Sequence, residues 1–142
     1  MILFYEPEEA SAAAAITAIG EELAIFDDWL ERYQFIIELG RKLPPYPEEL
    51  QNEAHRVQGC QSKVWLAADG GHEILRFTGA SDAAIVSGLV ALVLRVYSGR
   101  ERAEILGTSG AFLHDLGLIG ALSSNRGNGV AAMVERIQAM AR

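Results

Sequence analysis

The sequence has a single cysteine, Cys60, and is short of basic residues. One thiol cannot form a disulfide within a chain, whereas small secreted domains commonly depend on disulfides, so we expect a reducing, cytoplasmic location. The 12 lysines and arginines are outnumbered by 19 aspartates and glutamates. The resulting net charge of −7 repels phosphate backbones and argues against nucleic acid as the main partner.

Long hydrophobic runs are also missing. The longest apolar run, Leu89–Leu94, falls far short of the roughly 18 residues that a membrane-spanning helix requires. The first residues carry Glu6 and Glu8 where a secretory signal would carry lysine or arginine. We therefore predict no contact with a membrane and, from the length of 142 residues, one folded domain.

The chain lacks the ligand pattern of a metal centre. It has one cysteine and three histidines, His55, His72 and His114, without a Cys-x-x-Cys or His-x-x-x-His spacing. Structural zinc and iron–sulfur sites usually take four ligands, several of them thiolates. The sequence thus predicts no metal and no cofactor held by this chain alone.

The middle of the chain has the pattern of β-strands. Residues 63–68 and 73–78 flank the turn signal Asp-Gly-Gly at 69–71 and predict a hairpin, and residues 55–58 predict a further short strand. Four side chains of the hairpin are expected to face the core: Val64, Leu66, Leu75 and Phe77. Cys60 then lies on the connection between two strands.

Helical patterns surround these strands. A helix that is apolar almost all round follows Ser81, a good N-cap, and ends at Gly99, so it should be buried against the sheet. An amphipathic helix starts after Asp27 or Asp28 and stops at Gly40. Short helices are expected over 101–106 and 110–118, and a longer one over 123–141.

These elements together predict an α+β fold, with a small antiparallel sheet of about three strands packed against helices. Residues 1–20 are expected to form a variable leader, loose or weakly helical up to about residue 15, with moderate helical character from Ala12. Residues 21–142 are expected to form the single domain.

The surroundings of Cys60 leave its role open. A cysteine is a nucleophile only as the thiolate, and its reference pKa is about 8.5, so reactivity needs exposure and cationic or dipolar help. Arg56 and Lys63 are close in sequence, and Gly59 permits a sharp corner. Alternatively, a lone cysteine is often a small buried hydrophobic residue. His55 lies five residues away, and the sequence does not decide whether it approaches the thiol.

Four stretches together carry a family resemblance. They are ERYQFIIELGRKLPPYPEEL (31–50), HRVQGCQSKVWL (55–66), SDAAIVSGLVALVLRVYSGR (81–100) and LSSNRGNGVAAMV (122–134). Over about residues 22–141 the sequence resembles the SufE family of sulfur-acceptor proteins. The most specific part is Gly59-Cys60-Gln61-Ser62 followed by Val64-Trp65, and Arg126 with Asn128-Gly129 adds independent support.

The resemblance implies a function. SufE-like proteins work with a PLP-dependent cysteine desulfurase of the SufS type, which holds sulfur from L-cysteine as a persulfide on its own cysteine. Cys60 matches the family's acceptor, which takes this sulfane sulfur, stimulates the desulfurase and passes the sulfur to an iron–sulfur scaffold. The protein would then be a sulfur-transfer accessory rather than a stand-alone enzyme, and PLP would belong to the partner. The implied fold is shared with IscU-type scaffold proteins.

Supporting residues follow from the same comparison. Gly59, Gln61 and Ser62 are expected to shape the corner that carries the thiol. Arg126, Lys63 and His55 are candidates for contact with the partner or with the thiolate, although an arginine or lysine is more often simply solvated.

Two other functions stay open at this point. The protein could be an IscU-like scaffold that holds a cluster, although one cysteine would then need ligands from another chain. It could also be an allosteric activator that binds the desulfurase and transfers nothing.

Overall fold

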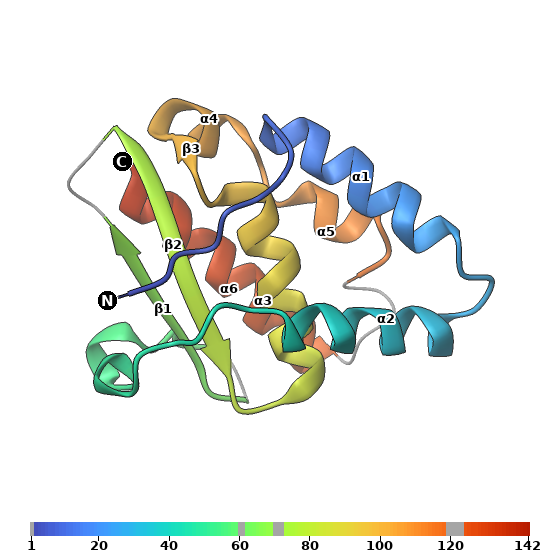
Figure 1. The fold of residues 1–142 in the computed structure, drawn as a ribbon, viewed down its shortest axis with the longest axis horizontal. Helices are drawn as coiled ribbons and strands as arrows, with labels where there is room; N and C mark the ends of the chain where they lie inside the picture. The colour runs from blue at the N-terminus through green and yellow to red at the C-terminus, as the bar shows by residue number, and fades with distance from the viewer. Residues whose placement is uncertain (1, 60–61, 70–72, 119–123) are drawn as a thin grey trace.

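The computed structural model describes residues 2–59, 62–69, 73–118 and 124–142, with side chains described again from Gly129 onward. Figure 1 shows the helices and strands, and two 3-10 turns, η1 and η2, precede the first strand. In chain order the elements are α1 (Ala12–Ala24), α2 (Trp29–Arg41), η1 (Glu48–Leu50), η2 (Glu53–His55), β1 (Val64–Asp69), β2 (Ile74–Ser81), α3 (Ala84–Tyr97), β3 (Arg100–Glu101), α4 (Arg102–Gly107), α5 (Ala111–Asp115) and α6 (Ser124–Ala141).

The strands form one antiparallel sheet with the order β1-β2-β3. In the hairpin, Val64 pairs with Ser81 at one end and Asp69 with Arg76 at the other. All four hairpin side chains that were predicted to face the core are buried. The α+β fold and the small sheet are therefore confirmed, while Gly70 and Gly71 of the predicted turn lie outside the described residues.

The third strand is not where the sequence pattern placed it. Residues 53–55 form the 3-10 turn η2, because the Asn52 side chain caps it by accepting a hydrogen bond from the His55 N–H at 3.2 Å. Only Arg56 makes an isolated bridge, to Trp65. The third strand is instead the pair Arg100–Glu101, which is too short to show an alternating pattern.

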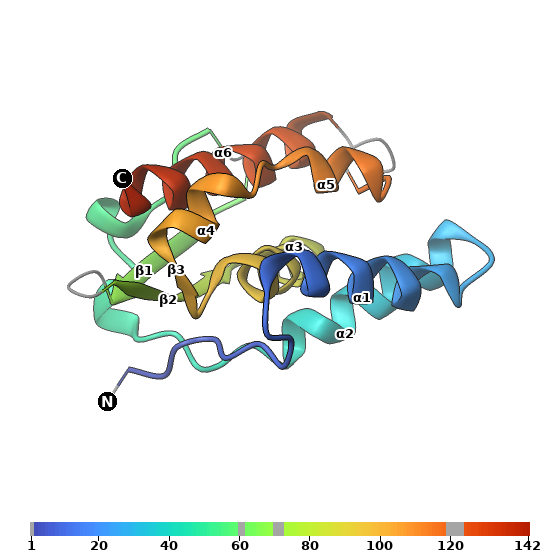
Figure 2. The ribbon, with the colours of Figure 1, turned by 90° about the horizontal axis from the view of Figure 1, so that it is seen from above.

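Helix α3 lies at the centre of the molecule. Figure 2 shows α4, α5 and α6 on one side of it and α2 on the other, with α1 level with it. Nearly all of its residues from Val86 to Tyr97 are buried, as expected for a helix that is apolar all round. The predicted cap was wrong, because Ser81 still belongs to β2 and its hydroxyl accepts from the Ala83 N–H at 3.2 Å. The N-cap is Ala83, which has no side-chain hydrogen bond.

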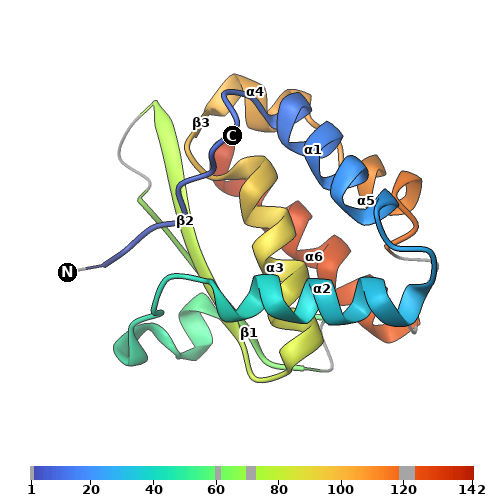
Figure 3. The same cartoon turned by 45° about the vertical axis from the view of Figure 1, so that its right-hand side comes forward.

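Helices α2 and α3 approach each other at two glycines, and Figure 3 shows them crossing. A Cβ on Gly88 would overlap the carbonyl oxygen of Ile36, and a Cβ on Gly40 would lie 2.6 Å from the Gly88 nitrogen. Gly40 was predicted to stop its helix, but α2 continues through it to Arg41, and it is not among the described glycines with positive φ. Its role is to let the two backbones come close.

The segment before α1 is attached to the core. The Tyr5 N–H donates to the Phe77 carbonyl at 2.8 Å, so this segment lies along the edge of β2. The buried Ser98 hydroxyl accepts from the Phe77 N–H at 2.9 Å and donates to the Tyr5 carbonyl at 2.7 Å. The expectation of a loose segment was wrong here, because these hydrogen bonds hold it and Tyr5 packs against the core.

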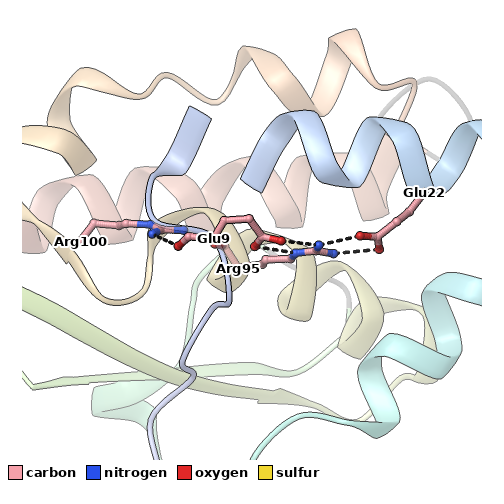
Figure 4. Close-up of polar contacts among 4 residues, drawn as sticks. All are labelled: Glu9, Glu22, Arg95 and Arg100. Carbon is pink, nitrogen blue, oxygen red and sulfur yellow. Dashed lines mark hydrogen bonds and ion pairs between the residues drawn. The ribbon is translucent and has the colours of Figure 1, made fainter. Parts of the chain in front are cut away.

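Two arginines reinforce this attachment, as Figure 4 shows. Arg95 of α3 donates to Glu9 at 2.7 Å and to Glu22 of α1 at 2.6 Å. Arg100, 4% exposed, donates to the backbone carbonyls of Glu9 at 2.7 Å and Val96 at 3.1 Å. The hydrogen bond from Arg95 lowers the pKa of Glu9 below its ordinary value. Helix α1, which spans Ala12–Ala24, runs across the boundary predicted at residue 20. The division into a leader and a domain stays a prediction.

The glycine contact leads to a prediction about stability. We expect Gly88→Ala to lower the free energy of unfolding by about 3 kcal/mol, because the added methyl group meets backbone rather than a movable side chain. The matched control is Gly107→Ala, since a Cβ at Gly107 meets nothing within 4 Å. Urea denaturation of both variants measures the difference, and equal stabilities would contradict the proposed contact.

The Arg95 pair leads to a prediction about pH. The folded-state pKa of Glu9 is below the ordinary value of 4.5, so its stabilising effect is present above pH 4.5 and is lost as the pH falls. We expect Glu9→Gln to cost about 2 kcal/mol at pH 7 and to cost clearly less at pH 3. Glu6→Gln, whose carboxylate pairs with Arg76 at the surface, should change stability little at either pH.

Candidate functional site

The segment that carries Cys60 is closed at its base by strand-like pairing. The Val57 N–H donates to the Val64 carbonyl at 2.9 Å, and the next pair outward from the segment is the Arg56–Trp65 bridge. Val57 and Val64 are each 2% exposed, so the two ends of the segment leave from the hydrophobic core. Cys60 and Gln61 themselves lie outside the described residues.

Gly59 turns the chain just before the cysteine. Its φ of +91° lies in the region that side chains disfavour. A Cβ at this position would make an ordinary contact, 3.7 Å from the Ala132 Cβ, so the backbone conformation rather than space calls for glycine. This fits the sharp corner predicted at Gly59.

The residues that follow Cys60 are bonded to the chain just before α3. The Lys63 N–H donates to the Asp82 carboxylate at 3.0 Å, and the Asp82 N–H donates back to the Lys63 carbonyl at 3.2 Å. Lys63 is exposed and Ser62 half-buried. The backbone of Lys63 therefore has a structural partner, while its ammonium group is available to solvent or to another protein.

The residues that precede Cys60 are bonded to α6, which Figure 2 shows passing alongside this part of the chain. The Arg136 guanidinium donates to the carbonyls of Arg56 at 3.1 Å and Ala54 at 2.9 Å. Two groups that are distant in sequence, Asp82 and Arg136, thus hold the two ends of the Cys60 segment.

The structure describes the other residues that the sequence singled out, the histidines and Arg126, to different extents. His55, in η2, has its Nδ1 2.8 Å from the Asn52 carboxamide oxygen. Arg126 is in the first turn of α6, on the same helix as Ala132 and about 9 Å along its axis from it. The side chain of Arg126 is outside the described residues, as is His72, and His114 is exposed on α5. The roles of Arg126, Lys63 and His55 stay predictions.

An open groove borders the segment. It has a volume of about 640 Å³ and lies between residues 57–58 and the second half of α6. Its lining is mixed, with the apolar Val57 and Ala132 beside the charged Glu135, Arg136 and Arg142. The groove therefore lies beside the chain that leads to Cys60.

Within the described residues, no group of three His, Cys, Asp or Glu side chains is placed to hold a metal ion. That search does not cover Cys60 or His72. Among the same residues, none of the helices has both the length and the apolar character to cross a bilayer.

Sequence reasoning missed both anchors of the segment. Asp82 follows a strand and precedes a helix, a position typical of a capping residue, and only the fold shows that it binds Lys63 instead. Arg136 lies on the partly exposed side of an amphipathic helix, where an arginine is usually solvated. The sequence contains no signal that would distinguish it.

Comparisons with known proteins agree with this geometry. Residues 17–141 match the family model described as SufE, the Fe-S metabolism associated domain. An uncharacterised SufE-like protein of Rhizobium meliloti (strain 1021) is 41% identical over 132 residues, which span 89% of this chain and 94% of the relative. An uncharacterised SufE-like protein of Rhizobium etli is also 41% identical, over 134 residues and 91% and 90% of the two chains.

A solved structure is similar as well. It is the solution structure of a hypothetical protein from Thermus thermophilus, with a TM-score of 0.74, 25% identity, and coverage of 90% of this chain and 93% of that one. The four motifs, the three-stranded sheet and a family match over most of the length agree, and on this ground the chain belongs to the SufE family of Fe-S metabolism associated proteins.

Proposed function

We propose that this protein is a cytoplasmic sulfur acceptor that takes sulfane sulfur as a persulfide on Cys60 from a PLP-dependent cysteine desulfurase. It stimulates that enzyme and relays the sulfur to iron–sulfur cluster assembly. One observation supports this most strongly. The only thiol of a SufE-family chain follows a positive-φ glycine, on a segment whose two ends are held by α6 and by the start of α3.

The transfer step needs no oxidant or reductant. The Cys60 thiolate attacks the outer sulfur of the donor persulfide, the sulfur–sulfur bond of the donor breaks, and the donor cysteine leaves as a thiolate. A new sulfur–sulfur bond forms on Cys60, as in thiol–disulfide exchange. PLP and the cleavage of L-cysteine belong to the desulfurase, and this chain provides the acceptor and its presentation.

The lack of a second cysteine suits a carrier. A neighbouring thiol in the same chain could attack the Cys60 persulfide, form a disulfide and release the sulfur as sulfide. With one cysteine in the chain, this loss cannot occur within the molecule. Loss of the sulfur then requires a thiol from outside the molecule.

Mass spectrometry tests the acceptor role. After mixing with a SufS-type desulfurase, PLP and L-cysteine, the intact protein should gain one sulfur atom under non-reducing conditions and lose it again with a thiol reductant. Cys60→Ser should gain none, with circular dichroism as the check that it is folded. A variant without Cys60 that still accepts sulfur, or still fully stimulates desulfurase turnover, would falsify the relay and favour a non-transferring activator.

A second measurement separates the acceptor from a cluster scaffold. Incubation with ferrous iron, sulfide and reductant under anaerobic conditions should give no stable visible absorption, because one thiolate per chain provides too few ligands for a cluster. Gel filtration followed by iron analysis checks the result. A coloured species with one cluster per monomer would show that the scaffold function is correct.

A further inference from the structure

We propose that Arg136 is a positioning residue for sulfur transfer, an inference that rests on the proposed function of Cys60. Its guanidinium holds the chain that leads into the Cys60 segment against α6. The thiol is then presented from a base of fixed position rather than from a free loop.

The contact has the geometry of a clamp. Two nitrogens of one planar group bind two carbonyls on the same stretch of chain, Nη1 to Arg56 at 3.1 Å and Nη2 to Ala54 at 2.9 Å. Hydrogen bonds from a charged donor are stronger than those between neutral groups. A guanidinium that spans two carbonyls also fixes the orientation of the chain, which a single bond would not do.

The same face of α6 also passes close to the chain nearer to the cysteine. Ala132 lies one helical turn before Arg136, and its Cβ is 3.7 Å from the point where a Cβ on Gly59 would lie. Between the Arg136 bonds and Gly59 lies Val57, buried and paired with Val64. Helix α6 therefore holds the approach to Cys60 at Ala54 and Arg56 and passes close to it again at Gly59.

Arg136 acts through this backbone and not on the reacting sulfur. Its Nη1 and Nη2 donate to carbonyls of its own chain. The side chain of Arg56 is engaged separately, 3.6 Å from the Glu53 carboxylate, so Arg136 recognises the carbonyl of that residue and not its charge.

The chain offers a matched control in Arg102. Its Nη1 donates to the Met140 carbonyl at 3.0 Å and ties α4 to α6, which is also a bond from a guanidinium to a backbone carbonyl. Met140 lies about 12 Å beyond Ala132 along the helix axis, away from Gly59. Arg102→Gln therefore removes a similar bond from the same helix without touching the approach to Cys60.

The test compares Arg136→Gln and Arg102→Gln in persulfide formation on Cys60 over a range of desulfurase concentrations. We expect Arg136→Gln to lower the maximal rate about ten-fold and to leave the half-saturating desulfurase concentration within about two-fold, because positioning is lost rather than a partner contact. Arg102→Gln should keep the wild-type rate. An Arg136→Gln variant with the wild-type rate, or equal losses in both variants, would overturn the proposal.

Two further measurements make the result specific. Arg136→Lys keeps the charge but not the two-pronged donor, so it should also be slow, and a full wild-type rate in this variant would contradict the clamp. Hydrogen exchange of the Val57 amide should be about ten-fold faster in Arg136→Gln than in Arg102→Gln. If wild-type Cys60 gains no sulfur, the proposed function fails, and the exchange rates alone decide whether Arg136 holds the segment.

Discussion

A helix that is apolar around its whole circumference must be covered from every direction, and this requirement of α3 organises the molecule. The sheet, α1, α2 and α6 each cover part of it. Two local solutions make this possible. Gly40 and Gly88 let α2 approach at backbone distance, and Arg95, the charged side chain of this helix, is only 14% exposed and paired with two glutamates.

The segment before α1 is part of the same solution. It fills the edge of β2 beside Phe77, a place where unpaired backbone groups would otherwise meet solvent or another strand. Arg95 and Arg100 hold it through Glu9, by the carboxylate and by the backbone carbonyl. Ion pairs and hydrogen bonds thus hold the segment that covers the edge of β2.

The candidate site depends on this arrangement. Val57 and Val64 leave the core as a pair, Asp82 holds Lys63 at the point where β2 turns into α3, and α6 carries both Ala132 and Arg136. The elements that cover α3 are therefore the elements that hold the chain on either side of Cys60. Packing of the core and anchoring of the chain on either side of Cys60 therefore depend on the same elements.

Strong local patterns determined much of this protein by themselves. The alternating strands, the apolar helix up to Gly99, the single thiol and the Gly59 corner follow from residue type and spacing, which act over a few residues. Only the tertiary structure decided the third strand at Arg100, the packing role of Gly40, the attached Tyr5 segment and the Arg136 clamp. Each of these depends on backbone groups far apart in sequence. Every residue carries the same backbone carbonyl, so the sequence does not show which carbonyl will accept a hydrogen bond from a distant donor.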